Sequence, residues 1–195
     1  DGEDVCDILG LKSELEEKTL TIGEKLSIRR FAKISGDCVA SYTHGGGRIG
    51  VMVKFDVTDE VAANPEFKEA AKDVAMQIAA LNVPFLSEDT VPADRIAQEK
   101  EIITVQIKND PKSANKPDAI IEKMATGRLN KFFKENCLLD QEFVKDSSMS
   151  VSKYLDTVAK KIGGDIKIVD FVRFEKGEGL EKKEDNFADE VASMM

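Results

Sequence analysis

The chain has 195 residues, of which 42% are hydrophobic and 33% are charged, and its 37 acidic and 28 basic side chains give a net charge of −9. A chain of this length can bury enough apolar surface to fold without disulfides or metal ions. The acidic balance disfavours direct binding to nucleic acid or to an anionic membrane, because both need a basic surface. The acidic start of the chain is unlike a signal peptide, and no apolar run reaches the roughly 20 residues of a membrane span, so we expect a cytoplasmic protein.

The three cysteines, Cys6, Cys38 and Cys137, are widely spaced and form no C-x-x-C pair. Only one histidine, His44, could join them as a metal ligand. This pattern favours free thiols in a reducing compartment over a disulfide framework or a zinc site. We therefore expect no metal site and no cofactor.

The first part of the chain predicts a short helix followed by three strands. Apolar residues at helical spacing indicate an amphipathic helix over 11–22, which Gly23 ends. Apolar and polar residues then alternate most clearly over 49–57, which predicts a half-buried strand. Two shorter strands, 28–34 and 39–43, precede it, and glycine-containing turns separate the three. We expect an antiparallel meander.

A strong helix start follows at Asn64-Pro65-Glu66, with Asn as the cap and Pro at the first helical position. The apolar stripe of this helix should cover the sheet. Two further helices begin near Pro92 and Pro117 and flank a short polar turn, so we predict an antiparallel helical hairpin over 92–136.

The last third of the chain predicts a helix, a strand and a second helix. Ser150 can cap a helix that ends at Gly163, and an apolar strand follows over 166–174. Phe187, Val191 and Met194 are spaced as on a final amphipathic helix. Together these elements predict an α+β fold with antiparallel sheets packed against helices and a protruding helical hairpin.

The segment from Gly45 to Gly50 satisfies the pattern G-x-G-x-x-G of dinucleotide-binding loops. That loop works when a strand precedes it and a helix N-terminus follows it, aimed at the pyrophosphate. Here a strand follows, so a glycine-rich hairpin turn is the favoured interpretation. A nucleotide-binding enzyme that uses this loop remains the alternative.

His44 is the single histidine and the only candidate base for His-assisted nucleophilic catalysis. No catalytic group can be assembled around it from the sequence. One interpretation is a turn residue satisfied by the main chain. The other is a partner contact, because a side chain at a strand end beside glycines projects outward.

Five short stretches, which together span nearly the whole chain, carry a resemblance to a known family: Ile22-Gly23-Glu24 with Ile28-Arg29-Arg30-Phe31, Tyr42-Thr43-His44-Gly45 with Arg48-Ile49-Gly50-Val51, Ala75-Met76-Gln77-Ile78-Ala79-Ala80, Glu122-Lys123-Met124 with Gly127-Arg128-Leu129-Asn130-Lys131-Phe132, and Phe171-Val172-Arg173-Phe174 with Gly177-Glu178-Gly179 and Phe187-Ala188. In these stretches and in their order, the chain resembles the elongation factor Ts family of bacteria.

The resemblance implies a guanine-nucleotide exchange factor that binds elongation factor Tu and promotes GDP release, without covalent chemistry of its own. It implies a core of two α+β subdomains, which we place at 28–86 and 87–195 after an N-terminal helix and connection over 1–27. The helical hairpin would be a coiled coil. The family's partner contacts correspond here to Ile22, Gly23 and His44, with Phe187 and Val191 as further candidates in the terminal segment.

The sequence departs from the family pattern in three places. The family has an N-terminal helical domain and a Thr-Asp-Phe motif that reaches the partner's magnesium site, and neither occurs in these 195 residues. Gln77 stands where many family members have His, and Asn115 replaces a glycine at the hairpin tip. We expect the chain to bind elongation factor Tu and to accelerate GDP release poorly. A homodimer formed through the hairpin is compatible with this role.

Overall fold

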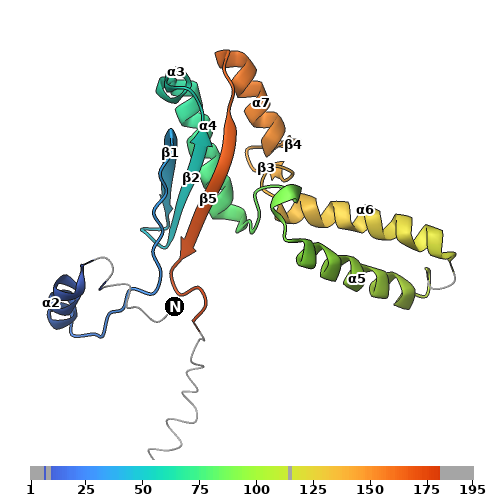
Figure 1. Ribbon diagram of the computed structural model, residues 1–195, viewed down its shortest axis with the longest axis horizontal. Helices are drawn as coiled ribbons and strands as arrows, with labels where there is room; N and C mark the ends of the chain where they lie inside the picture. The colour runs from blue at the N-terminus through green and yellow to red at the C-terminus, as the bar shows by residue number, and fades with distance from the viewer. Residues whose placement is uncertain (1–6, 8–9, 114–115, 181–195) are drawn as a thin grey trace, which may run out of the picture. The chain divides into compact units, whose positions relative to one another are not determined.

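The structure, a computed structural model, describes residue 7 and residues 10–113 and 116–180 (Figure 1). The chain forms two compact units, residues 1–35 and 36–195. The subdomain boundaries expected after residues 27 and 86 stay predictions.

In the first unit, helix α2 (Lys12–Ile22) confirms the predicted helix over 11–22. It ends at Gly23, which has a φ of 79° and donates its N–H to the carbonyl of Thr19. Glycine adopts this left-handed conformation without the steric cost that a side chain adds. The cap leaves Ile22 at the exposed end of the helix.

The predicted strand over 28–34 is wrong, because this segment forms no strand in the structure. Its apolar alternation indicates an extended chain, but a strand also needs a neighbour that pairs with its main-chain N–H and C=O groups. Within the described residues, both edges of the central strand β2 (Ile49–Asp56) are occupied by other strands. The expected meander therefore lacks its first member.

The main sheet contains β1 (Cys38–His44), β2 and β5 (Lys167–Glu175) in the order β1-β2-β5, with both pairs antiparallel. These strands confirm the predicted strands over 39–43, 49–57 and 166–174. Figure 1 shows β5, from the far end of the chain, beside β2. Alternate side chains of β2 are buried, namely Val51, Val53 and Phe55.

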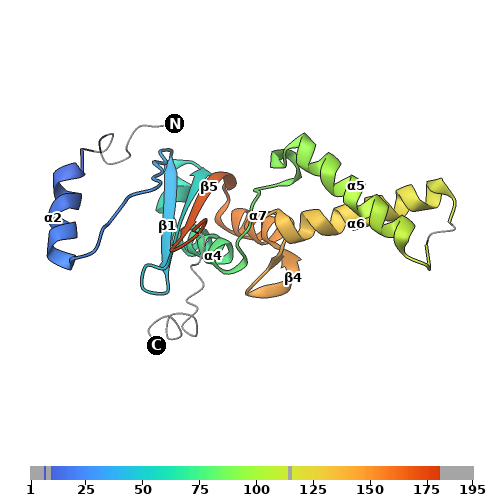
Figure 2. The same cartoon turned by 90° about the horizontal axis from the view of Figure 1, so that it is seen from below.

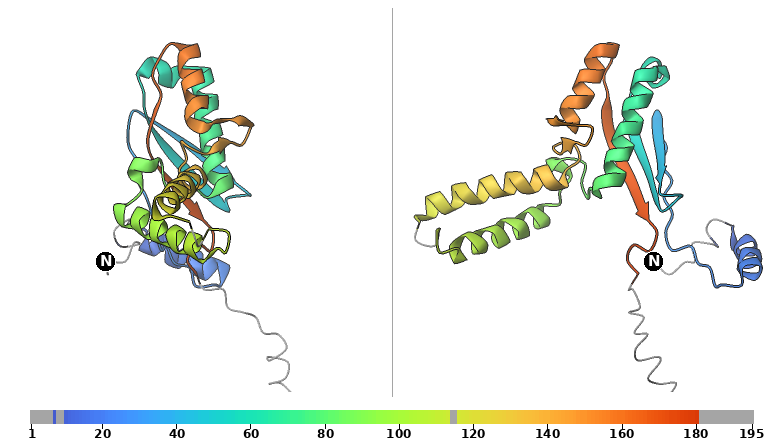
Figure 3. Two further views of the ribbon diagram at one scale, coloured as in Figure 1. Left: turned by 90° about the vertical axis from the view of Figure 1, so that its right-hand side faces the viewer. Right: turned by 180° about the vertical axis from the view of Figure 1, so that it is seen from behind.

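Two helices, α4 (Pro65–Leu81) and α7 (Val151–Ile162), pack beside each other, and α4 covers β1 and β2 (Figure 3). The start of α4 is as predicted, since the Asn64 side chain accepts a hydrogen bond from the Glu66 N–H at 2.9 Å. A short helix, α3 (Asp59–Ala63), leads into it. The core between sheet and helices includes an edge-to-face contact of Phe55 and Phe67, with ring centroids 5.3 Å apart.

The helical hairpin consists of α5 (Ala93–Asn109) and α6 (Asp118–Asn136), which lie side by side (Figure 2). A cluster of four buried residues joins them: Ile103, Ile107, Ile121 and Ala125. A second cluster, at the base of the hairpin, contains Val91, Phe132, Phe133 and Cys137. A short 3₁₀ turn, η1 (Glu88–Thr90), comes directly before Val91 in the sequence. The two helices and their antiparallel direction are confirmed, whereas supercoiling of the pair stays a prediction.

A small antiparallel ribbon, β3 (Glu142–Phe143) and β4 (Asp146–Ser150), connects α6 to α7. The sequence did not predict it, because these polar residues lack the apolar alternation of a half-buried strand. Ser150 caps α7 as predicted, and its hydroxyl accepts from the Lys153 N–H at 3.3 Å. The fold is thus α+β with two antiparallel sheets.

Candidate partner-binding site

The turn between β1 and β2 positions His44. Gly45, Gly46 and Gly47 all have positive φ, between 60° and 90°, and the N–H of Arg48 closes the turn on the carbonyl of Gly45 at 3.4 Å. The glycines are therefore required by the backbone of the hairpin. Strand β2 follows the loop directly, so the loop lacks the helix N-terminus on which a pyrophosphate would sit.

His44 is the last residue of β1 and its side chain is exposed. Its Nδ1 lies 3.1 Å from the hydroxyl of Tyr42, and the two rings are tilted by 34°. The Tyr42 ring is partly buried and packs against the main core, whereas its hydroxyl reaches the surface. A core residue thus supports the only histidine of the chain at the edge of the sheet.

Three charged residues lie at the same end of the sheet: Arg48 in the β1–β2 turn, and Arg173 and Glu175 on β5. Glu175 of β5 is two strands away from His44 in one register row, because both pair with Ile49. Its two carboxylate oxygens lie 3.9 Å from Arg48 Nε and 2.7 Å from Arg173 Nη2. The Arg173 side chain is only 8% exposed, and its Nε has no hydrogen-bond partner among the described residues. This group fixes the end of β5 against the β1–β2 turn.

Ile22 and Gly23 form the end of α2 in the first unit. The Ile22 side chain is 58% exposed, and Leu20, two residues earlier in α2, is more exposed still. Exposed aliphatic residues at a rigid glycine cap are suited to burial against a partner. Ile22 and Gly23 are consecutive in the sequence, so the fold brings neither to the other, and His44 belongs to the other unit. Phe187 and Val191 lie outside the described residues.

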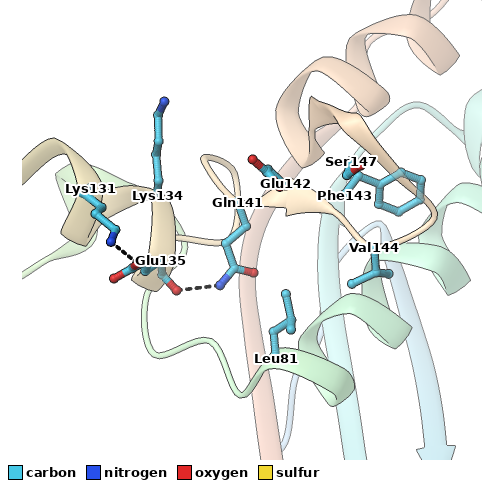
Figure 4. Close-up of a pocket in the computed structure, with 9 residues that line it drawn as sticks. All are labelled: Leu81, Lys131, Lys134, Glu135, Gln141, Glu142, Phe143, Val144 and Ser147. Carbon is cyan, nitrogen blue, oxygen red and sulfur yellow. Dashed lines mark hydrogen bonds and ion pairs between the residues drawn. The ribbon is translucent and has the colours of Figure 1, made fainter.

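A surface pocket of about 650 Å³ lies where the end of α4, the end of α6 and the β3–β4 ribbon meet (Figure 4). Its apolar part includes Leu81 and Val144, which are 46% and 47% exposed. Lys131 and Lys134 of α6 line it too, and Lys131 pairs with Glu135 at 3.5 Å. The sequence did not indicate this pocket, since its residues come from three separate segments.

A pair of buried glutamines lies next to the pocket, and one of them, Gln141, also lines it. Gln77, in the apolar stripe of α4, is fully buried, and its Nε2 donates to the Glu142 carbonyl at 3.0 Å and to Gln141 Oε1 at 3.2 Å. Gln141 Nε2 in turn donates to the carbonyl of Glu135 in α6 at 2.7 Å. Two glutamine side chains therefore link α4, the ribbon and the base of the hairpin.

An ion pair lies one turn earlier in α4. Lys145 Nζ is 2.6 Å from Asp73 Oδ1, and the Tyr154 hydroxyl donates to Asp73 Oδ2 at 3.1 Å. Burial raises the pKa of Tyr154, and the charge of Asp73 raises it further. The Tyr154 ring also stacks on Phe143, with centroids 4.1 Å apart. The ribbon is thus held to α4 and α7 by polar and aromatic contacts together.

Burial raises the pKa of the Cys137 thiol to about 11, with smaller contributions from Asp140 and Glu88. Cys38 is half-buried and its pKa is also raised by burial. No group of three or more metal-ligating side chains occurs in the described parts of the chain. Within the described residues, the features that suit a partner contact are the exposed side chains of Ile22, at the capped end of α2, and His44, at the end of β1.

Residues 7–178 match the family model described as Elongation factor TS. The chain belongs to the elongation factor Ts family. It is 48% identical over 187 residues to the elongation factor Ts of Clostridium botulinum strain ATCC 19397, a match that covers 95% of this chain and 59% of the relative. It is 51% identical over 172 residues to that of Clostridium kluyveri strain ATCC 8527, covering 87% and 54%. The chain thus spans little more than half the length of these relatives.

Ile22, Gly23 and His44 all lie within the segment that matches the elongation factor Ts model, whereas Phe187 and Val191 follow it. Tyr42, Arg48 and Glu175 were not predicted as site residues. Tyr42 and Arg48 do flank His44 in the motif that carries the resemblance, so their position was a usable signal. Glu175 gave none, because its place beside Arg48 depends on a long-range strand pairing. None of the described helices is long and apolar enough to cross a membrane.

Proposed function

We propose that this chain is the core of a cytoplasmic translation elongation factor that binds elongation factor Tu and promotes its release of GDP. The observation that carries the proposal is the family match over residues 7–178. The exposed positions of Ile22 and His44 support it, since both family contact residues are available on the surface. The chain would perform no covalent chemistry.

The physical basis of such exchange is thermodynamic linkage. A protein that binds the nucleotide-free form of elongation factor Tu more tightly than the GDP form must weaken GDP binding by the same factor. The contacting side chains of this chain need only fit the nucleotide-free form of elongation factor Tu better than they fit its GDP-bound form. A rigid sheet end and a capped helix suit this task, because side chains that are already ordered lose less entropy on binding.

Isothermal titration calorimetry of the 195-residue chain with nucleotide-free elongation factor Tu tests the proposal. We expect saturable binding, with one chain per factor. The absence of a binding signal over micromolar concentrations of both proteins would overturn it. Light scattering of the chain alone measures whether it is a monomer or a homodimer, which sets the stoichiometry to be fitted.

Equilibrium dialysis of the chain alone with GTP, ATP or NAD distinguishes our proposal from the nucleotide-binding alternative. Our proposal requires that none of them binds in the absence of elongation factor Tu. Retention of a nucleotide that is lost on replacing Gly46 by Val would instead support a site at the 45–50 loop.

A further inference from the structure

Among the described residues, His44 shares a side-chain hydrogen bond with Tyr42, and the chemistry of that bond determines what His44 can offer to a partner. The bond joins the Tyr42 hydroxyl to Nδ1 over 3.1 Å. Residues i and i+2 of a strand lie on one face, so Tyr42 and His44 share the helix-covered face of β1. Tyr42 pairs with the buried Val51, whereas His44 pairs with Ile49 next to the turn.

Each ring nitrogen of a neutral histidine is either a donor or an acceptor, and the partner of one nitrogen sets the role of the other. A phenol hydroxyl is a good donor, and its oxygen is a weak acceptor because the ring withdraws its lone pair. A bare imidazole nitrogen is a strong acceptor. The favoured arrangement therefore has Tyr42 donating to an unprotonated Nδ1, which leaves the proton of His44 on Nε2.

Resting on the proposed function, we propose that Tyr42 is a positioning residue for His44: its hydroxyl holds the imidazole in the Nε2–H form, and this N–H donates to an oxygen acceptor on elongation factor Tu. The anchor is firm because the Tyr42 ring packs against the core of the sheet and α4. The exposed imidazole is thus ordered before the partner arrives. Such ordering lowers the entropic cost of the contact.

The tautomer can be measured without any partner. His44 is the only histidine, so a long-range ¹H–¹⁵N spectrum of the labelled chain contains a single imidazole. At a pH above the usual histidine range, we expect Nδ1 to resonate as a bare, hydrogen-bonded nitrogen and Nε2 as an N–H. In Tyr42→Phe, the Nδ1 resonance should move to the position of a bare nitrogen without a donor. A protonated Nδ1 in the wild type, or an unchanged Nδ1 in Tyr42→Phe, would overturn the proposal.

Binding to elongation factor Tu gives the second readout. We expect Tyr42→Phe to weaken binding roughly two- to tenfold, the range that one net hydrogen bond supports. Tyr154→Phe is the matched control, because Tyr154 is the only other tyrosine and its hydroxyl bonds Asp73 instead. Equal losses in the two variants would overturn the proposal.

Substitutions of His44 itself test the donor. The amide nitrogen of Gln reaches the place of Nε2, whereas that of Asn reaches the place of Nδ1, so His44→Gln should bind more tightly than His44→Asn. Adding Tyr42→Phe to His44→Gln should cost nothing further, because no Nδ1 remains. The reverse order, or an undiminished cost in the double variant, would overturn the proposal. If the wild type itself fails to bind elongation factor Tu, the proposed function and the partner contact fail together, while the tautomer measurement still decides the role of Tyr42.

Discussion

The main-chain N–H of Val144 in the ribbon loop donates to the side-chain oxygen of Gln77 in α4, with 2.8 Å between N and Oε1. The side-chain N–H of Gln77, on Nε2, donates to the Glu142 carbonyl. One glutamine amide thus pairs with a main-chain donor and a main-chain acceptor of the β3–β4 ribbon. The Gln77 side chain thus satisfies main-chain groups of the ribbon that a neighbouring strand would pair inside a sheet.

Replacing Gln77 by Leu should lower the free energy of unfolding by about 2–4 kcal/mol, because it leaves a partly buried N–H, a partly buried C=O and the side-chain oxygen of the buried Gln141 without this partner. Urea unfolding followed by circular dichroism measures this. Gln106→Leu, on an exposed face of α5, is the matched control and should change stability by less than about 0.5 kcal/mol. Equal effects of the two substitutions would contradict the role of Gln77.

Tyr154 predicts a loss of stability in alkaline solution. Burial and the Asp73 charge raise its pKa in the folded protein above the ordinary value of about 10. The folded state therefore holds the proton where the unfolded state releases it, so this contribution is complete below about pH 10 and is lost as the pH rises towards the folded pKa. In Tyr42→Phe, Tyr154 is the only tyrosine, and its ultraviolet absorbance should show ionisation well above pH 10 that shifts down on unfolding. Ionisation near pH 10 in the folded protein would contradict the prediction.

Cys137 should resist thiol reagents in the folded protein. It is fully buried, and with a pKa of about 11 only about one thiol in a thousand is a thiolate at pH 8. In a Cys6→Ser background, the half-buried Cys38 should react first, and Cys137 should react at the rate at which the base of the hairpin opens. Mass spectrometry of peptides sampled over time distinguishes the two. Labelling of Cys137 as fast as Cys38 would contradict its burial.

The elements that sequence predicted well are those specified by adjacent residues. Asn64 and Pro65 fix the start of α4 by a local cap, and Gly45 to Gly47 fix the β1–β2 turn by their backbone conformation. Such signals act within a few residues and need no knowledge of the rest of the fold. The family resemblance extended this to the identity of His44 as a contact candidate.

The errors and omissions concern long-range pairing. The alternation over 28–34 indicated a strand, but the second edge of β2 is taken by β5, more than a hundred residues later. The same pairing brings Glu175 to Arg48. Gln77 was visible within an apolar stripe, but its two main-chain partners lie 65 and 67 residues away. No local pattern specifies which distant segment meets a given one.

Ile22 should contribute to binding through its exposed side chain. Replacing it by Ala should weaken binding to elongation factor Tu by about five- to thirtyfold, corresponding to about 1–2 kcal/mol of apolar burial in the complex. The free energy of unfolding should change little, because Ile22 is largely exposed in the free chain. Val169→Ala, an exposed aliphatic residue on β5, is the control and should bind as the wild type does. Unchanged calorimetric affinity of Ile22→Ala would remove this residue from the interface.

His44→Ala should weaken the complex too, with unfolding by urea unchanged because the side chain is exposed. The loss should exceed that of Tyr42→Phe, since the alanine variant lacks the contacting ring as well as its support. Calorimetry of both variants with one preparation of elongation factor Tu measures the difference. A smaller loss for His44→Ala than for Tyr42→Phe would mean that Tyr42 contacts the partner directly.

The chain should bind elongation factor Tu but accelerate its release of GDP poorly, because these 195 residues contain no Thr-Asp-Phe sequence. In the family pattern that motif reaches the magnesium site of the partner, so its absence removes part of the difference in fit between the empty and the GDP-bound factor. We expect the chain at saturation to release a fluorescent GDP analogue from elongation factor Tu more slowly than the longer Clostridium kluyveri relative does. The chain should bind the nucleotide-free factor more tightly than the GDP-bound factor by a modest ratio. It should lower the affinity of the factor for GDP by the same ratio, since the coupling is reciprocal. Release as fast as that produced by the longer relative would show that the contacts around Ile22 and His44 suffice for exchange.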